Sequence, residues 1–304
     1  MNNLILIFIY IVVGLILQRI KGFPVSKVYK GFNKLVIYYC LPALALFYIP
    51  KIHWNNQLLY PIGVAWIGFA GAFILFRFLG KKYGWSKKLT GCLILTAGLG
   101  NTSFLGFPII QALYGDEGMK TAILVDQPGS FVVLSTLGIL VATLYSKGGE
   151  SGGAILKKIL LFPPFITFVV ACIMNIYNFD FQQWVQSTLQ FVGSGVTPLA
   201  LLSVGLQLRF ETRSQHWKFL GLGLLYKLIL TPAIIYILYV LVFNQSSKII
   251  EVAIMEAAMA PMITACILAS SHRLKPRLSS MMIGFGIPIS FVTLIFWYFV
   301  VQFV

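Results

Sequence analysis

The chain has 304 residues, of which 59% are hydrophobic and 10% are charged. This apolar content excludes ordinary soluble classes and indicates an all-α polytopic membrane protein. The formal charge of +15 is better explained by basic cytoplasmic loops than by a nucleic-acid partner. The four cysteines and three histidines are scattered along the chain, so we expect no disulfide, zinc site or other metal cluster.

The first apolar run, residues 3–20, is predicted to be a membrane helix and not a signal peptide. It lacks a basic start, and Arg19 and Lys21 follow the apolar run instead of preceding it. This pattern predicts a first helix with its N-terminus outside the cell.

Hydropathy predicts ten membrane spans. Nineteen of the 23 Lys and Arg residues fall in alternate loops, three fall in the other loops, and Lys227 lies inside the eighth span. The positive-inside rule then places both termini outside. The predicted spans are residues 3–20, 32–50, 57–77, 88–114, 118–146, 158–178, 183–208, 217–243, 248–271 and 277–303.

The fourth span contains residues that interrupt a helix. Glycine costs about 1 kcal/mol inside a helix and proline about 3 kcal/mol. A broken helix within a membrane is tolerated where it is buried in protein or lines a cavity, and such breaks often mark transporter binding sites. A kink that serves packing is the alternative interpretation. The stretch is Leu99-Gly100-Asn101-Thr102-Ser103-Phe104-Leu105-Gly106-Phe107-Pro108.

Weak internal matches predict a duplication. Pro128 and Pro288 begin similar segments 160 residues apart, Pro42 and Pro198 begin segments 156 residues apart, and Pro108 and Pro261 lie 153 residues apart. We expect a first five-helix repeat in residues 1–146, a flexible polar linker in residues 147–153, and a second repeat in residues 154–304. Because five is odd, the second repeat is inverted in the membrane.

The ninth span is the expected partner of the fourth in this repeat. Glu256 precedes Ala260-Pro261, so a polar side chain again lies beside a helix breaker. Counted from opposite membrane faces, Asn101 and Glu256 lie at comparable depths. Two such helices are predicted to cross near the membrane midplane, with their ends directed at one shared site.

Asp126, Lys227 and Glu256 are the ionisable residues well inside the predicted spans. Each is costly against lipid, so each is expected to face a cavity or a partner. The two carboxylates could meet Na⁺, with oxygens from neighbouring polar residues, or they could carry a proton. A structural ion pair of Lys227 with one acid is the alternative. Lys34 and Arg77 lie near span ends and are expected to extend toward the membrane surface.

Other motifs do not support catalysis. Gly98-Leu-Gly100-Asn-Thr-Ser103 lacks the last glycine of a dinucleotide-binding motif, and the chain has no phosphate-binding loop, zinc-protease motif or catalytic triad pattern. Gly193-Ser194-Gly195 is interpreted as a close helix contact rather than a ligand site. We therefore expect the chain not to be an enzyme and to need no cofactor, apart from a possible coupling Na⁺.

Three motifs together resemble the auxin efflux carrier family: residues 100–108, Asp126-Gln127-Pro128-Gly129, and residues 256–261. That family includes bacterial malate and malonate permeases and the plant PIN-formed auxin exporters, and the short loops favour the bacterial branch. The resemblance implies a five-plus-five fold like that of sodium–bile acid symporters and sodium–proton antiporters. It also implies a scaffold of spans 1, 2, 6 and 7, a transport domain of spans 3–5 and 8–10, and homodimerisation. Family members often have Pro-Pro where this chain has Ala260-Pro261.

The sequence thus predicts an elevator-type secondary transporter of small organic anions in the cell's inner (plasma) membrane, coupled to H⁺ or Na⁺. The alternatives are an uncoupled uniporter or exporter, a passive channel, a membrane-embedded anion sensor, and an intramembrane hydrolase whose aspartyl dyad would be Asp126 and Glu256. Cation coupling is assigned to Asp126, Gln127, Glu256 and Asn101. Substrate binding is assigned to Gly100, Asn101, Thr102, Ser103, Gly106, Pro108, Ala260, Pro261 and Lys227.

Overall fold

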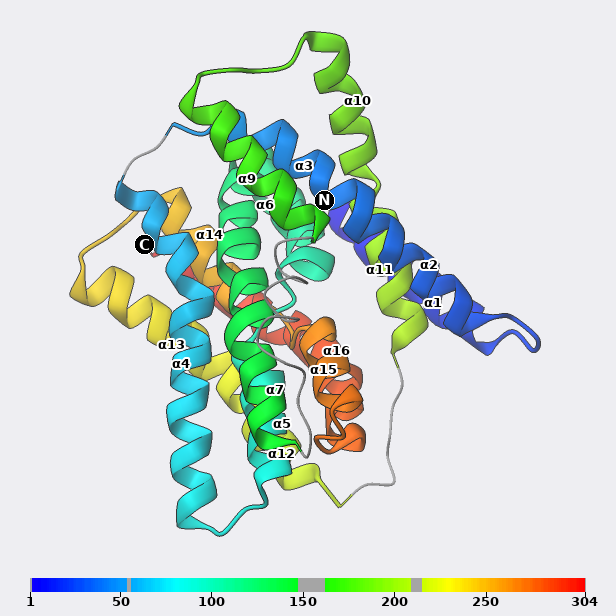
Figure 1. Cartoon of the computed structure of the whole chain (residues 1–304), viewed down its shortest axis with the longest axis vertical. Coiled ribbons are helices and arrows are strands. Elements are labelled where there is room, and N and C mark those ends of the chain that lie inside the picture. Colours follow the sequence, from blue (N-terminus) through cyan, green and yellow to red (C-terminus); the bar gives the residue numbers. More distant parts are fainter. Residues whose placement is uncertain (1, 54–55, 147–161, 209–214, 304) are drawn as a thin grey trace. The chain divides into compact units, whose positions relative to one another are not determined.

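The computed structural model describes residues 2–53, 56–146, 162–208 and 215–303, and every regular element in these residues is a helix (Figure 1). The predicted linker, residues 147–153, lies outside the described residues. The helices up to residue 146 are α1 (Asn2–Arg19), α2 (Val25–Leu35), α3 (Leu41–Tyr48), α4 (Leu59–Lys82), α5 (Lys87–Gly98), α6 (Phe107–Leu124) and α7 (Ile139–Tyr145). Those after residue 161 are α9 (Pro163–Ile176), α10 (Gln183–Ser194), α11 (Val196–Gln207), α12 (Trp217–Leu225), α13 (Thr231–Tyr236), α14 (Lys248–Ala257), α15 (Ile263–Ser271) and α16 (Pro276–Val301).

Short helical turns of other types connect several of these helices. Two 3₁₀ turns cover Ile49–Lys51 and Asn56–Leu58. Wider π-helical turns often occur at functional sites. In the described chain they are Val36–Cys40, Thr102–Gly106, Val125–Phe131, Leu134–Gly138, Tyr226–Leu230 and Ile237–Val242.

Six helical segments within the described residues are long and apolar enough to cross a membrane, and two shorter apolar helices accompany them. The longest runs over Thr102–Tyr145, but Gly115 within it has φ 61° and ψ −152°, which no helix contains. This glycine conformation separates two helical stretches, near the predicted boundary between the fourth and fifth spans. The architecture is that of a polytopic helical protein, and the ten-span inverted repeat stays a prediction.

The chain divides into two compact units, and neither follows the predicted repeats. The first unit comprises residues 1–56, 103–123 and 158–208, and the second comprises residues 57–102, 124–157 and 209–304. Each unit is therefore assembled from both halves of the sequence. The predicted scaffold and transport domains stay predictions.

In the first unit, α1 packs against α11 through two glycines. A Cβ atom on Gly14 would lie 2.5 Å from the carbonyl oxygen of Leu202, and one on Gly205 would overlap the backbone of Ile11. Small residues let two helix backbones approach closely, as they do in membrane helix pairs. Side-chain hydrogen bonds add to this contact, because the Gln18 amide donates to the carbonyls of Leu206 and Leu208.

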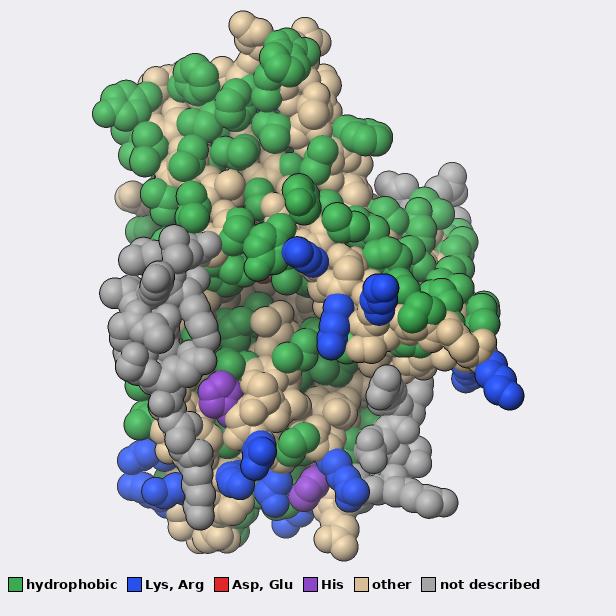
Figure 2. All heavy atoms as spheres, turned by 45° about the vertical axis from the view of Figure 1, so that its right-hand side comes forward, with side chains coloured by type: hydrophobic (Ala, Val, Ile, Leu, Met, Phe, Trp, Pro, Cys, Tyr) green, Lys and Arg blue, Asp and Glu red, His purple; other side chains and the backbone are tan. Residues whose placement is uncertain are grey.

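In the second unit, α4 packs against α5 and α14, and α16 packs against α12, α14 and α15. Two buried aromatic side chains donate hydrogen bonds to backbone carbonyls of neighbouring helical segments. The Tyr226 hydroxyl donates to the carbonyl of Gly68 (2.7 Å), and the Trp297 indole N–H donates to the carbonyl of Leu228 (2.9 Å). Large apolar side chains such as Ile74 and Val292 are exposed, and hydrophobic atoms cover much of the face shown in Figure 2. Such a surface suits a lipid environment.

We expect Gly205→Val to lower the stability of the purified protein by about 1–3 kcal/mol, because the added atoms must force α1 and α11 apart. Gly221→Val is the matched control, since a Cβ there meets nothing within 4 Å. The measurement is the melting temperature of each variant in detergent. Equal melting temperatures for the two variants would show that the glycine contact is not tightly packed.

Candidate functional site

The first interruption lies between α5 and the helical stretch that begins at Thr102. The hydroxyl of Ser86 caps α5 by accepting a hydrogen bond from the Leu89 amide (3.3 Å). The helix ends at Gly98, and Leu99 is extended, with φ −124° and ψ 137°. Gly98 has to be small, because a Cβ there would lie 3.0 Å from Phe69 and 3.2 Å from Ala72 of α4.

The second interruption lies between α14 and α15. Helix α14 ends at Ala257, and Met262 is extended, with φ −67° and ψ 122°, before α15 starts at Ile263. Pro261 lies in this gap, where its missing N–H removes no helical hydrogen bond. Both interruptions belong to the second unit.

The two interruptions pair with each other. Gly100 and Pro261 form an isolated antiparallel β-bridge. The Asn101 amide donates to the Ala260 carbonyl (2.8 Å), and the Met262 amide donates to the Leu99 carbonyl (3.0 Å). Backbone groups left unpaired in an apolar interior cost several kcal/mol each. This short ladder therefore lets both helices break inside the protein.

Lys227 lies against this bridge. It occupies the π-helical turn Tyr226–Leu230 and is buried. Its Nζ donates to the carbonyl of Ala257 at 2.6 Å, so the ammonium lies at the negative C-terminal end of α14. A Cβ on Gly100 would lie only 3.1 Å from Nζ and 3.4 Å from the Glu256 carbonyl. A larger residue at position 100 would therefore crowd the Lys227 ammonium.

Asp126 also reaches the interruption, although no helix break adjoins it in the sequence. It lies in the π-helical turn Val125–Phe131. The Thr102 hydroxyl donates to one oxygen of its carboxylate (2.5 Å), and the Gln127 amide donates to the other (3.1 Å). All three side chains are buried. This network links the residue after the first interruption to the fifth predicted span.

Three buried side chains of the site retain unpaired polar atoms among the described residues: the Nδ2 of Asn101, the Oε1 of Gln127 and both carboxylate oxygens of Glu256. Asp126 and Lys227 interact electrostatically with Glu256. The amide nitrogen can only donate, and the other three atoms accept. The site therefore offers a donor suited to an anion and acceptors suited to a cation or a proton.

The predicted residues do not all meet here. Gly100, Asn101, Thr102, Asp126, Gln127, Lys227, Glu256, Ala260 and Pro261 belong to the second unit, and Ser103, Gly106 and Pro108 belong to the first. The predicted equivalence of Pro108 and Pro261 is wrong. Pro108 lies within a continuous helical stretch, just after the π-helical turn Thr102–Gly106, whereas Pro261 lies in the interruption and pairs with Gly100.

The sequence predicts no cluster of the side chains that usually bind metal ions. Among the described residues no group of three His, Cys, Asp or Glu side chains could hold a metal ion. A sodium ion at this site would therefore depend on mixed oxygen ligands, such as the carboxylate of Glu256 and the amide oxygen of Gln127. Hard oxygen ligands of this mixed kind suit small hard cations.

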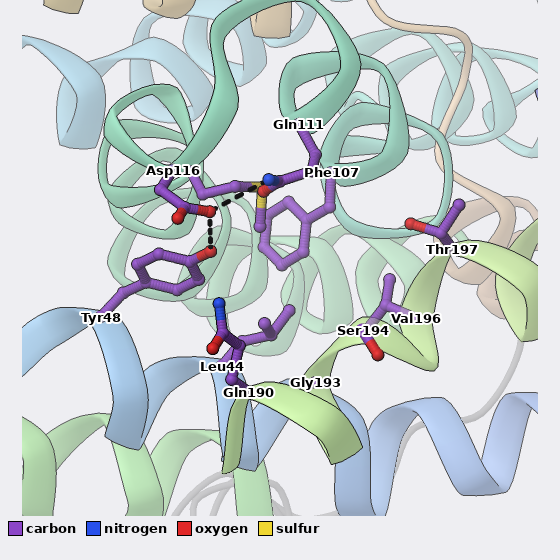
Figure 3. Close-up of a pocket in the computed structure, with 11 residues that line it drawn as sticks. Leu44, Tyr48, Phe107, Gln111, Asp116, Gln190, Gly193, Ser194, Val196 and Thr197 are labelled. Carbon is purple, nitrogen blue, oxygen red and sulfur yellow. Dashed lines mark hydrogen bonds between the residues drawn. The ribbon is translucent and has the colours of Figure 1, made fainter. Parts of the chain in front are cut away.

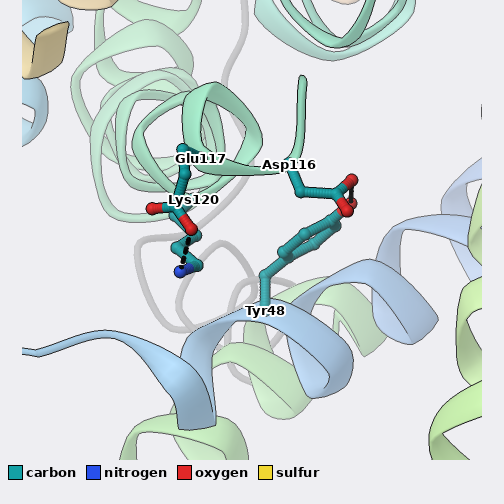
Figure 4. A network of polar contacts seen from close by, with 4 residues as sticks. All are labelled: Tyr48, Asp116, Glu117 and Lys120. Carbon is teal, nitrogen blue, oxygen red and sulfur yellow. Dashed lines mark hydrogen bonds and ion pairs between the residues drawn. The ribbon is translucent and has the colours of Figure 1, made fainter. Parts of the chain in front are cut away.

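Sequence reasoning missed a cavity of about 150 Å³ in the first unit (Figure 3). In it the Asp116 carboxylate accepts hydrogen bonds from the Tyr48 hydroxyl (2.7 Å) and the Gln111 amide (3.0 Å). Figure 4 shows the hydrogen bond between Tyr48 and Asp116 beside the ion pair of Glu117 with Lys120 (2.7 Å). The lining residues are Leu44, Tyr48, Phe107, Gln111, Asp116, Met119, Gln190, Gly193, Ser194, Val196 and Thr197.

The Gly193-Ser194-Gly195 motif has a part in this cavity. A Cβ on Gly193 would lie 2.5 Å from the side chain of Leu44, so the predicted close helix contact is confirmed. Gly193 and Ser194 also line the cavity. The polar residues Gln190, Ser194 and Thr197, spaced three to four positions apart, were the available signal for a polar helix face.

Comparison with known proteins agrees with this description. Residues 1–298 match the family described as membrane transport protein. The chain belongs to this family. The predicted membership of the auxin efflux carrier family is thereby confirmed.

Two archaeal proteins of the family are similar over nearly their whole lengths. An uncharacterised transporter of Methanocaldococcus jannaschii is 27% identical over 305 residues, covering 98% of this chain and 97% of that protein. An uncharacterised transporter of Methanothermobacter thermautotrophicus is 26% identical over 298 residues, covering 96% and 95%. Together with the long apolar helices, family membership makes this a multi-pass membrane protein.

We expect Thr102→Val to destabilise this transport-family protein by about 1–3 kcal/mol, because the buried Asp126 loses a hydrogen-bond donor. Thr102→Ser keeps the hydroxyl and serves as the control. Melting temperatures in detergent compare the two. A Thr102→Val protein as stable as the parent would show that the Thr102–Asp126 bond carries little energy.

Proposed function

We propose that this chain is a secondary active transporter of small organic anions, mono- or dicarboxylates such as malate or malonate. The observation that carries the proposal is the buried Nδ2 of Asn101, a donor without a partner among the described residues, beside two paired helix interruptions. A buried donor left unpaired costs about 1–3 kcal/mol. A carboxylate oxygen is the ligand that would satisfy it.

The helix ends around Asn101 favour the same ligand. Helix α15 begins at Ile263, and a helical stretch begins at Thr102. The start of a helix carries partial positive charge and binds anions. An ammonium group has three donors, so Lys227 can hold the Ala257 carbonyl and also donate to a bound carboxylate. In this proposal the backbone of Gly100, Ala260 and Pro261 lies close to the bound anion.

A cation completes the proposed mechanism. Asp126 and Glu256 carry one more negative charge than Lys227 balances, and Glu256 has no described hydrogen-bond partner for either oxygen. An isolated buried charge is costly, so binding of H⁺ or Na⁺ at Glu256 would neutralise the cluster. Coupling of anion and cation would follow, because each ligand offsets the charge of the other.

Movement of the site between membrane faces is proposed to follow the elevator mechanism. Asn101, Asp126, Lys227 and Glu256 all belong to the second unit, so this unit carries the whole charged cluster. That distribution supports transport in which one unit moves as a body. We further propose a homodimer in the cell's inner (plasma) membrane with both termini outside.

An uncoupled carrier of the same anions is the second candidate. Its support is Lys227, whose buried Nζ donates to the Ala257 carbonyl and interacts electrostatically with Glu256. A tethered cation of this kind would replace a coupling ion. Asp126 and Glu256 would then serve packing or gating, and flux would run only downhill.

We expect Asn101→Ala to abolish carboxylate uptake, because the mutation removes the unpaired donor at the bridge. Pro108→Ala is expected to weaken uptake less, since Pro108 lies outside the interruption, just after the π-helical turn Thr102–Gly106. Asn56→Ala, at an exposed position, is the control. The measurement is uptake of radiolabelled malate and malonate into proteoliposomes containing equal amounts of inserted protein. An Asn101→Ala protein that takes up anions like the parent would move the substrate site elsewhere.

We expect Glu256→Gln to abolish accumulation against a gradient while leaving equilibrium exchange of substrate. The substitution keeps the size of the side chain and removes the charge that a coupling cation would meet. Glu251→Gln, on the same helix but ion-paired with Lys248, is the matched control. Proteoliposomes are tested under imposed H⁺ and Na⁺ gradients.

The two candidates give opposite results for the parent protein. Accumulation driven by either gradient, lost only in Glu256→Gln, supports coupling through Glu256. Downhill flux that is insensitive to both ions supports the uncoupled carrier. Accumulation by Glu256→Gln at the level of the parent would make Glu256 structural.

A further inference from the structure

Helix α2 presents two different faces. One face packs against α11 in the first unit, where Asn33 contacts the Ser203 hydroxyl and Val36 is fully buried just beyond the helix end. On the other face, Lys27, Lys30 and Lys34 are exposed. Because these positions are three and four apart, the lysines form one stripe along the helix.

An open groove of about 490 Å³ lies along this exposed face. Its floor has space at Gly31, where a Cβ would meet nothing within 4 Å. Leu35 and Tyr39 in the groove are exposed to 44% and 60%. The groove thus combines ammonium groups with uncovered apolar side chains. Its lining residues are Lys27, Val28, Gly31, Phe32, Lys34, Leu35 and Tyr39.

The length of the helical segment is compatible with lysines at the membrane surface. The segment Val25–Lys51 has 27 residues and is about 40 Å long at 1.5 Å per residue. The hydrocarbon core of a bilayer is about 30 Å thick. The segment is therefore about 10 Å longer than the core, and its lysine-bearing end suits the layer of lipid headgroups, with the apolar residues that follow suited to the acyl chains.

Among the residues that the structure describes, the lysine stripe forms no ion pair. The first 115 residues of the chain contain no Asp or Glu, and the ion pairs within the described residues that the structure shows involve Lys120 and Lys248. On the face drawn in Figure 2, Lys and Arg side chains are visible and no Asp or Glu is seen among the described residues. The positive charge of α2 is therefore not balanced by any acidic side chain among the described residues and is available to an anionic group.

We propose that this α2 groove binds an anionic phospholipid, with its phosphate held by Lys27 and Lys34 and an acyl chain against Leu35 and Tyr39. Basic clusters beside a membrane helix recognise anionic headgroups in this way. A second copy of the chain fits less well, because a two-fold contact would bring the same lysines of both copies together. The proposal is independent of the transported substrate.

The test uses the full chain in detergent and native mass spectrometry titrations with phosphatidylglycerol and phosphatidylcholine of equal chain length. The parent is expected to bind phosphatidylglycerol more tightly. Each lysine near an anionic surface contributes roughly fivefold in affinity, so the double variant Lys27→Gln/Lys34→Gln is expected to bind it about 30-fold more weakly. Lys81→Gln/Lys82→Gln, an exposed basic pair at the end of α4, is expected to bind like the parent.

A second pair of variants tests the groove apart from its charge. Gly31→Phe fills the open floor and is expected to reduce phosphatidylglycerol binding, whereas Gly31→Ala is expected to leave it unchanged. All of these positions are exposed, and melting temperatures verify that each variant folds.

Several results would overturn the proposal. Equal loss of binding in both lysine pairs would indicate general electrostatic attraction, and binding by Gly31→Phe at the parent level would exclude the groove. Displacement of the lipid by millimolar inorganic phosphate would indicate a phosphate site without lipid specificity. Loss of a dimer in the Lys27→Gln/Lys34→Gln variant with unchanged lipid binding would assign the surface to a second copy.

Discussion

The candidate site depends on the hydrogen-bonded pairing of two broken backbones. A helix that stops inside an apolar protein leaves N–H and C=O groups without partners, and each such group costs several kcal/mol. Here Gly100 and Pro261 pair, and the amides of Asn101 and Met262 donate across the gap. Neither interruption could exist alone at this cost. Each supplies the hydrogen-bond partners that the other helix lacks, so the two breaks form one structural element.

The charged residues are arranged around that element. Lys227 donates to the last residue of α14, Ala257, and thereby neutralises a helix end. Thr102, the first residue of the helical stretch after the first interruption, donates a hydrogen bond to the carboxylate of Asp126. Both Lys227 and Asp126 lie in π-helical turns, which widen a helix locally and redirect its side chains. The groups on Asn101, Gln127 and Glu256 that have no hydrogen-bond partner among the described residues are a donor suited to an anion and acceptors suited to a cation.

The two units carry different polar features. The second unit holds the charged cluster, while the first holds the Asp116 cavity and the basic face of α2. In the first unit, glycines set the distances: Gly14 and Gly205 bring α1 onto α11, and Gly193 brings α10 close to Leu44 of α3. A unit packed by such backbone contacts has little freedom to deform.

The sequence alone determined the class of the protein and singled out several of the residues that lie at the two interruptions. Composition and apolar length are local properties, so they identified membrane helices, and Gly100, Pro261, Asp126, Lys227 and Glu256 stood out because helix breakers and charges are costly in apolar runs. Tertiary structure alone decided which of these residues meet. The bond from Thr102 to Asp126 and the pairing of Gly100 with Pro261, in place of the expected equivalence of Pro108 and Pro261, join residues 24 and 161 positions apart. No periodicity encodes such contacts, because they depend on how helices pack. The cavity around Asp116 also depends on packing, since its walls come from three separate stretches of the chain, and the sequence signalled only the polar face of Gln190, Ser194 and Thr197.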